Sequence, residues 1–126
     1  MCPVTRWDFD MVNVSVLTDL CSKKELKDWG SVTSPIGNPI SRQSGVLLFR
    51  NPDGSSEMGL WQCTPGEWRC DIERDEFCHF LVGRARYLSD SGEVIDIRPG
   101  TAAAFPRGWV GVCEVLETVR KVYMIG

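Results

Sequence analysis

A glutamate and a cysteine in one short apolar run are the residues of this chain best placed to do chemistry. The run EFCHFLV begins at Glu76 and ends at Gly83. Because side chains alternate faces along a strand, Glu76, Cys78 and Phe80 are expected to share one face. A carboxyl group in a desolvated pocket has a raised pKa and can act as a general acid or base. The alternative is purely structural: Glu76 forms an ion pair with Arg69 or another arginine and takes part in no reaction.

Aromatic side chains and one arginine are further candidates for a pocket around this glutamate. A guanidinium group presents paired donors, so Arg69 would suit a carboxylate-bearing small molecule, although a solvated surface arginine is more common. Five tryptophans in 126 residues is a high count, but most such rings belong to a core. The candidate ligand-binding residues are Trp61, Trp68, Arg69, Asp71, Cys78, Phe80, Trp109 and Cys113.

Short strand-like runs separated by glycine and proline turns must position these residues. The expected strands cover residues 44–50, 58–63, 77–82, 85–88, 93–97, 101–105, 110–116 and 120–125. Between the second and third of them the sequence predicts a turn and a loop. No amphipathic helices separate the strands, so parallel βαβ units are excluded and an all-β sandwich or barrel is predicted.

The N-terminal part is expected to be a lead-in to this barrel. Residues 1–44 should form a strand and an irregular segment packed on a barrel of residues 45–126, the whole being one domain. Val12, Val14 and Val16 alternate with polar residues, which predicts a short strand. The stretch from Ser22 to Gly30 resembles an N-capped helical turn closed by glycine, and the residues up to 43 are rich in turn formers.

Composition excludes several classes of protein. The formal net charge is −3, and no cluster of lysine and arginine suggests nucleic-acid binding. No apolar run approaches the length of a membrane span, and the first residues lack a secretory signal. We therefore expect a cytoplasmic protein with no membrane partner, in which the six cysteines are mostly buried free thiols.

Two spacings resemble the cupin family. Glu76 with six residues before Gly83 matches the second half of the first cupin motif, and Gly100-x5-Pro106-x-Gly108 matches the start of the second. The stretches GLWQCTPGEWRCD, DEFCHFLVGRARY and FPRGWVGVCEVLETVRKVYMI resemble small single-domain cupins related to the cupin part of (S)-ureidoglycine aminohydrolase and to an ethanolamine-utilisation cupin. The resemblance implies an RmlC-like jelly-roll barrel that encloses a pocket, usually in a homodimer.

The chain departs from the cupin motifs at the histidines that bind metal in this family. Counting back from the glutamate with the usual gap, the histidine positions hold Arg69 and Asp71; with a gap one residue shorter they hold Cys70 and Ile72. The histidine position of the second motif holds Gly111, which can donate no side chain.

Another set of metal ligands is conceivable. Cys78 and Cys113 are expected to face inward beside Glu76, and thiolates bind zinc well. The only histidine of the chain, His79, lies an odd number of residues from Glu76 and should face away. Buried cysteine is more often a small hydrophobe. We therefore expect no cofactor, with a divalent metal on Glu76, Cys78 and Cys113 as the open alternative.

The sequence thus predicts a cupin whose pocket around Glu76 binds a small polar or carboxylated metabolite. The alternative is a metal-dependent or metal-free enzyme, of hydrolase or isomerase type, that acts on a ureido or amino-acid-derived metabolite. The segment Arg120-Lys121-Val122-Tyr123 is also found in the relatives, and a charged outer strand face or a dimer contact would explain it equally well.

Overall fold

The computed structural model describes residues 13–126, and every regular element within them is a β-strand. The strands are β1 (Lys27–Ser31), β2 (Pro35–Ile36), β3 (Arg42–Arg50), β4 (Glu57–Cys63), β5 (Gly66–Asp71), β6 (Glu76–Ser89), β7 (Val94–Ile97), β8 (Ala102–Phe105) and β9 (Val110–Ile125). This confirms the predicted all-β class. Among the described residues no helix is long and apolar enough to cross a membrane.

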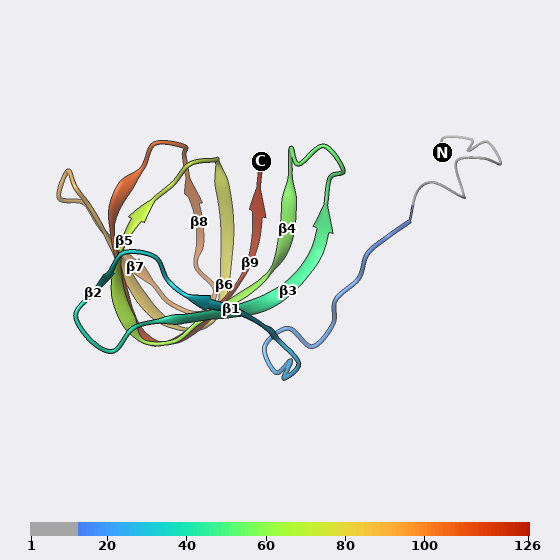
Figure 1. Ribbon diagram of the computed structural model, residues 1–126, viewed down its shortest axis with the longest axis horizontal. Coiled ribbons are helices and arrows are strands. Elements are labelled where there is room, and N and C mark those ends of the chain that lie inside the picture. The colour runs from blue at the N-terminus through green and yellow to red at the C-terminus, as the bar shows by residue number, and fades with distance from the viewer. Residues whose placement is uncertain (1–12) are drawn as a thin grey trace.

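All nine strands belong to one sheet that curls into an open barrel (Figure 1). The order along its main path is β1-β3-β4-β9-β5-β2, and β6 pairs with β7, β8 and β9. β6 and β9 run antiparallel along most of their lengths, with register shifts between Phe80 and Ala85. These shifts bend both strands, so each continues from one half of the curl into the other.

Each of these two long strands was expected as a pair of shorter ones. Gly83 resembled a strand end, but it lies inside β6 with a φ of +86°. A Cβ atom at this position would lie 2.0 Å from the carbonyl oxygen of Thr118. Glycine therefore allows β6 and β9 to approach closely at the bend, and it does not end the strand.

The lead-in differs from its predicted structure. Residues 13–16 form no strand, and Val14 and Val16 are exposed; Val12 lies outside the described residues. The predicted helical turn is absent, because its last residues form β1 on the edge of β3. There the Trp29 ring covers Gly45, where a Cβ atom would lie 2.5 Å from the indole. Packing of one tryptophan outweighs the weak helical preference of a short segment.

β5 is a strand of the barrel that the sequence did not predict. Residues Gly66–Asp71 were expected as a loop, but they pair with β9 on one side and with the short β2 on the other. Their composition is polar, yet Trp68 and Cys70 alternate with Glu67 and Arg69. This alternation of larger apolar and charged residues was the available signal.

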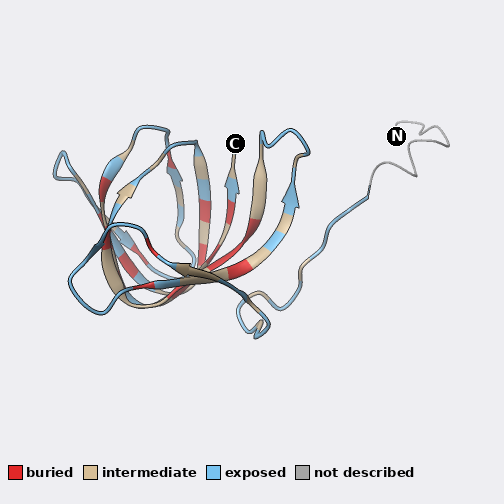
Figure 2. Ribbon diagram, viewed as in Figure 1, coloured by how far each residue is buried: buried red, intermediate tan, exposed pale blue. Residues whose placement is uncertain are grey.

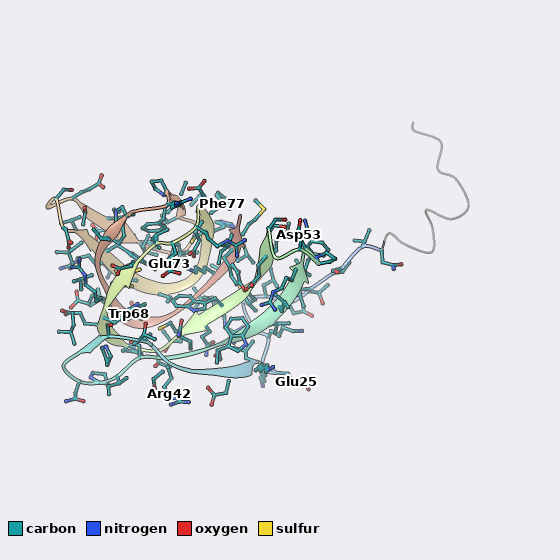
Figure 3. The ribbon with its side chains drawn as sticks, turned by 45° about the horizontal axis from the view of Figure 1, so that its top comes forward. Glu25, Arg42, Asp53, Trp68, Glu73 and Phe77 are labelled. Atoms are coloured by element: carbon teal, nitrogen blue, oxygen red, sulfur yellow. The ribbon has the colours of Figure 1, made fainter. Side chains whose placement is uncertain are left out.

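Buried residues lie along the strands of the curl (Figure 2), and most of them form one core cluster. The ring of Tyr87 packs 4.8 Å from that of Phe105, and the ring of Trp109 lies 5.3 Å from that of Phe105. Such tilted and edge-on contacts are favourable for aromatic pairs. Polar side chains such as that of Arg42, which binds Asp28, lie on the outside (Figure 3).

The convex face carries a row of apolar residues. In register across five neighbouring strands lie Phe49, Met58, Met124, Phe77 and Ala104. Phe49, Phe77 and Met124 are exposed. The homodimer that the cupin resemblance implies stays a prediction.

One arginine ties the lead-in to the sheet. On the convex face, Arg120 of β9 donates hydrogen bonds to the side chain of Gln62 at 2.7 Å, to the carbonyl oxygen of Leu20 at 2.8 Å and to that of Lys23. Charge-assisted bonds of this kind are stronger than neutral ones. Arg120 therefore holds residues 20–23 against the strands.

Replacing Arg120 with alanine should release this segment. We expect a loss of about 2 kcal/mol of stability from the charged hydrogen bonds and faster tryptic cleavage after Lys23 and Lys24. Limited proteolysis with mass spectrometry measures the cleavage. The control is Arg84→Ala, at an exposed position of β6; equal cleavage rates in the two variants would contradict the anchoring role.

Candidate functional site

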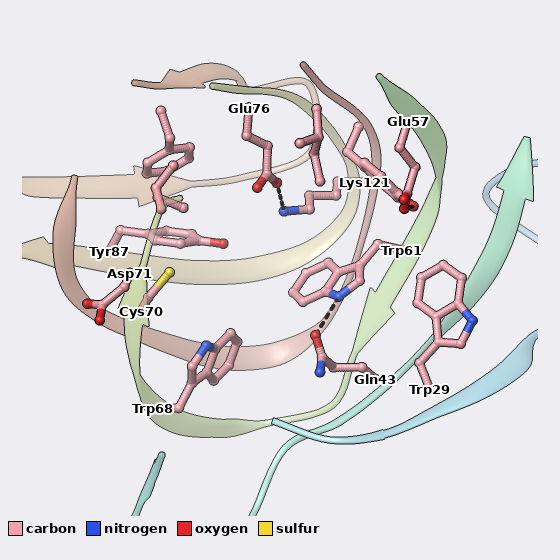
Figure 4. Close-up of a pocket in the computed structure, with 14 residues that line it drawn as sticks. Trp29, Gln43, Glu57, Trp61, Trp68, Cys70, Asp71, Glu76, Tyr87 and Lys121 are labelled. Carbon is pink, nitrogen blue, oxygen red and sulfur yellow. Dashed lines mark hydrogen bonds and ion pairs between the residues drawn. The ribbon is translucent and has the colours of Figure 1, made fainter. Parts of the chain in front are cut away.

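The concave face of the sheet lines a cavity of about 340 Å³ (Figure 4). Its walls come from strands at both ends of the described chain, and they combine aromatic rings with a few charged groups. The lining residues are Trp29, Gln43, Glu57, Trp61, Trp68, Cys70, Asp71, Ile72, Glu76, Tyr87, Phe105, Lys121, Tyr123 and Ile125.

An ion pair between Glu76 and Lys121 lies at the centre of this cavity (Figure 4). The Nζ atom of Lys121 donates to the Oε2 atom of Glu76 at 2.6 Å, and the two side chains are only 9% and 15% exposed. Glu76 opens β6 and Lys121 lies near the end of β9, next to β6 in the sheet. Lys121 faces inward because it alternates with the outward Arg120 and Val122.

Aromatic rings surround the lysine ammonium. Nζ of Lys121 lies 4.4 Å from the ring centroid of Trp61 and 5.7 Å from that of Phe80. The indole N–H of Trp61 donates to Oε1 of Gln43 at 3.0 Å, which fixes the ring (Figure 4). The faces of these rings stabilise the buried cation electrostatically.

The pair keeps both groups ionised. Burial alone would raise the pKa of Glu76, but the charge and hydrogen bond of Lys121 outweigh it and hold the pKa below its usual value. Burial alone would lower the pKa of Lys121, but Glu76 raises it instead. Of the two possibilities that the sequence left open for Glu76, the structure shows the ion pair, with a lysine in place of an arginine, and the pKa of the carboxyl group is lowered and not raised.

Cys78 lies beside this pair. Its thiol donates to Oε2 of Glu76 at 3.1 Å. Burial, together with the nearby carboxylate, raises the pKa of Cys78 to about 12 although Lys121 acts in the opposite direction. Burial likewise raises the pKa of Cys70, on the cavity wall, to about 11. Both thiols are therefore protonated at neutral pH.

Alkylation should distinguish the buried thiols from Cys21, the exposed thiol among residues 13–126. Cys21 is exposed, whereas Cys63, Cys78 and Cys113 are fully buried. Because the thiolate is the reactive form, we expect iodoacetamide at neutral pH to modify Cys21 first and the buried three only after unfolding. Peptide mass spectrometry over time measures this order. Modification of Cys78 as fast as that of Cys21 would contradict it.

A second carboxylate, that of Glu57 on β4, lies in register with Glu76 across the intervening strand β9 and also lines the cavity. The hydroxyl group of Tyr123 donates to Oε2 of Glu57 at 2.7 Å, and Arg50 donates to Oε1 at 2.9 Å from outside. The hydrogen bond from Tyr123 holds the pKa of Glu57 below its usual value. Glu57 was not a candidate from the sequence.

The structure brings together only part of the predicted site. Trp61, Trp68, Asp71 and Glu76 line the cavity.

The other candidates do not line the cavity. Cys78, Phe80 and Cys113 are buried in the core, and Trp109 packs against Tyr87 and Phe105. Arg69 does not line the cavity, because it points to the outside and binds Asp90. Neighbouring residues of a strand face opposite sides, so Trp68 can line the cavity only if Arg69 does not.

The donor groups in the cavity do not fit a metal ion. Each of the two possible histidine pairs in the first motif lacks one ligand, because Arg69 points to the outside and Ile72 has no donor atom. Neither Asp71 nor Cys70 therefore has a second ligand from its own pair. The carboxylate of Glu76 already accepts a hydrogen bond from the ammonium group of Lys121. No three His, Cys, Asp or Glu side chains of residues 13–126 could hold a metal together.

Close packing around Gly111 explains why the second motif has no histidine at this position. This residue lies in β9 between β5 and β6. A Cβ atom there would lie 2.1 Å from the carbonyl oxygen of Leu88 and 2.6 Å from the Trp109 ring. The indole of Trp109 therefore fills the space that a side chain at position 111 would need.

Solved structures of other proteins share this fold. A protein of unknown function from Pseudomonas syringae pv. tomato matches with a TM-score of 0.74 and 18% identity, over 82% of this chain and 45% of that one. The chain thus spans less than half the length of that protein.

Two proteins named EutQ match as well. The putative ethanolamine utilization protein EutQ of Salmonella typhimurium gives a TM-score of 0.58 at 19% identity, over 69% of each chain. The Clostridium difficile EutQ protein gives 0.59 at 18% identity, over 74% of this chain and 75% of that one. At these identities the likeness shows the fold alone. A search of curated proteins found no match.

The family itself is shown by the sequence. The sequence model of the EutQ-like cupin domain matches residues 50–123, which is more than half of the chain. The matched stretch carries the bent strand β6 with Glu76 and the part of β9 that holds Lys121. The chain therefore belongs to the EutQ-like cupin family.

Proposed function

We propose that the cavity binds a small polar molecule and that the Glu76–Lys121 pair is its polar anchor. The observation that carries this proposal is hydrogen-bonding capacity left over in the pair. Lys121 and Cys78 both donate to Oε2 of Glu76, and within residues 13–126 nothing donates to Oε1. An ammonium group has three N–H donors, of which Glu76 takes one.

The composition of the walls supports the same function. Small-molecule sites are mostly apolar and aromatic, with few polar groups that fix orientation, and their volumes begin near 300 Å³. Three indoles and one ion pair line this cavity. A buried ion pair contributes little stability compared with apolar residues of the same volume, so binding is a better reason for its presence than stability.

The main argument for a carboxylated ligand does not hold in the structure. Arg69 was the candidate partner for such a group, and its guanidinium binds Asp90 outside the cavity. We therefore propose a polar ligand without a required carboxylate.

Thermal stabilisation by a panel of small metabolites tests this function. A ligand that binds only the folded protein at one hundred times its Kd stabilises it by about 2.7 kcal/mol. We expect Glu76→Gln to abolish the shift, and the control Glu67→Gln, outside the cavity on β5, to retain it. No stabilisation by any compound of the panel would overturn the proposal.

The ionisation of the Glu76–Lys121 pair favours binding over the enzyme alternative. A general acid or base works best with a pKa near the operating pH, whereas Lys121 lowers the pKa of Glu76 and the pKa of Lys121 itself is raised. A hydrolase or isomerase acting on a ureido or amino-acid-derived metabolite would be supported if the panel compound that binds were consumed, and if Glu76→Gln abolished turnover but not binding.

A further inference from the structure

We infer that the cavity selects a small organic cation, an amine or a quaternary ammonium compound, over an anion of the same size. This inference rests on the proposed binding function and adds the charge of the ligand to it. It is carried by three features of the walls: their net charge, their aromatic faces and an acidic residue with little compensation.

The formal charge of the cavity walls is negative. Three carboxylates, of Glu57, Asp71 and Glu76, and one ammonium group, of Lys121, line the cavity, which leaves a formal charge of −2. No other lysine or arginine among residues 13–126 lines it. Arg50 offsets part of the charge of Glu57, but from the exposed outer side. Charge of one sign in a cleft raises the local concentration of ligands of the opposite sign.

The aromatic walls suit a cation as well. Indole faces attract an ammonium group within about 6 Å of the ring centroid. Trp61 already does so, because Nζ of Lys121 lies 4.4 Å from its centroid. Trp29 and Trp68 have no cation in contact within the described residues, and both line the same cavity. One indole of the cavity therefore already contacts a cation, and the indoles of Trp29 and Trp68 are available to contact a cationic ligand.

Of the three carboxylates that line the cavity, that of Asp71 has its negative charge least neutralised by nearby cations. Its only ion-pair partner in the described part of the chain is Nε of Arg69, at 3.9 Å, and its side chain is 64% exposed. It is the last residue of β5, three residues after Trp68, and it lies at the exposed rim of the cavity whose lining includes both residues (Figure 4). The carboxylate of Asp71 and the ring of Trp68 together form the part of the site that would take the cationic group.

An anionic ligand should bind less tightly. Lys121 is the one cation in the cavity, and it is already hydrogen-bonded to Glu76. An anionic ligand would have to share that ammonium group with the carboxylate while lying near two more. Like charges brought together in this way are unfavourable.

Three compounds of nearly equal shape test the charge preference: choline, its uncharged carbon isostere dimethylbutanol, and the anion dimethylbutanoate. Titration calorimetry or NMR shift titration with the full chain measures binding of each. We expect choline to bind most tightly and dimethylbutanoate least. We also expect Asp71→Asn to weaken the binding of choline roughly fivefold and to leave the binding of dimethylbutanol unchanged.

The matched control is Asp96→Asn. Asp96 resembles Asp71 in exposure, at 65%, and in its single contact with an arginine at 3.9 Å, but it lies on β7 away from the cavity. This variant should bind choline like the unchanged protein. Equal weakening by the two substitutions would overturn the role of Asp71.

The outcomes separate this inference from the function on which it rests. If dimethylbutanol or dimethylbutanoate binds as tightly as choline, or another uncharged or anionic compound binds and choline does not, the cation preference is overturned and the binding function stands. If no compound of any charge binds, the binding function itself is overturned.

Discussion

Replacing Lys121 with methionine should destabilise the fold by about 3–5 kcal/mol, the loss typical of removing one partner from a buried ion pair. The substitution keeps the length of the side chain but leaves the carboxylate of Glu76, only 15% exposed, without its cation. The phenyl and indole faces that now surround the ammonium cannot replace it for an anion. Chemical unfolding monitored by tryptophan fluorescence measures the change.

A double variant separates the loss of the charge from the loss of packing. In Glu76→Gln/Lys121→Met neither side chain is charged, so most of the destabilisation should be recovered. If the double variant is as unstable as Lys121→Met alone, the uncompensated carboxylate is not the cause.

The pH dependence of the stability of the same variants gives a second test of the ion pair. Lys121 holds the pKa of Glu76 in the folded protein below its value in the unfolded chain, near 4.5. The resulting stability is present above that value and is lost as the pH falls through the lower, folded pKa. The stability difference between the unchanged protein and Lys121→Met should therefore be full at neutral pH and shrink below about pH 4.5.

Restoring the motif histidine by Gly111→His should destabilise the protein by about 3 kcal/mol or more and should not create a metal site. The Cβ atom alone would lie 2.1 Å from the carbonyl oxygen of Leu88, so backbone must move before the imidazole is placed. Gly111→Ala should show most of the same loss, because it adds only that atom. Thermal unfolding and metal analysis of the purified variants measure both effects.

Gly108→Ala is the control for this substitution. Nothing lies within 4 Å of a Cβ atom at this position, but its φ is +95°. We expect only the backbone strain of a non-glycine residue, about 1–2 kcal/mol. A Gly111→His protein of normal stability that binds zinc would show that the steric argument is wrong.

The sequence predicted the fold class and the face of β6 that carries the site. Strand alternation set Glu76, Cys78 and Phe80 on one face, and turn residues delimited most strands, because both signals are local. In the structure Glu76 lies in the cavity wall and the other two are buried behind it.

The partner of Glu76 could not be predicted in the same way. Lys121 is 45 residues away in the chain, and the contact depends on the register between β6 and β9, which passes through several bulges. No local pattern encodes that register. The same limit applies to Trp29, whose place in the cavity depends on β1 adding to the edge of β3.

The position of β9 in the sheet also determines when the cavity can form during folding. β9 is the last strand in sequence, yet it pairs with β4, β5 and β6. Until it inserts, these three strands have unpaired edges and Glu76 has no ammonium neighbour. Pairing between segments distant in sequence is slow, typically milliseconds to seconds for all-β domains. A chain that is still being synthesised therefore exposes β-edges and apolar inner surface, which makes it prone to aggregation.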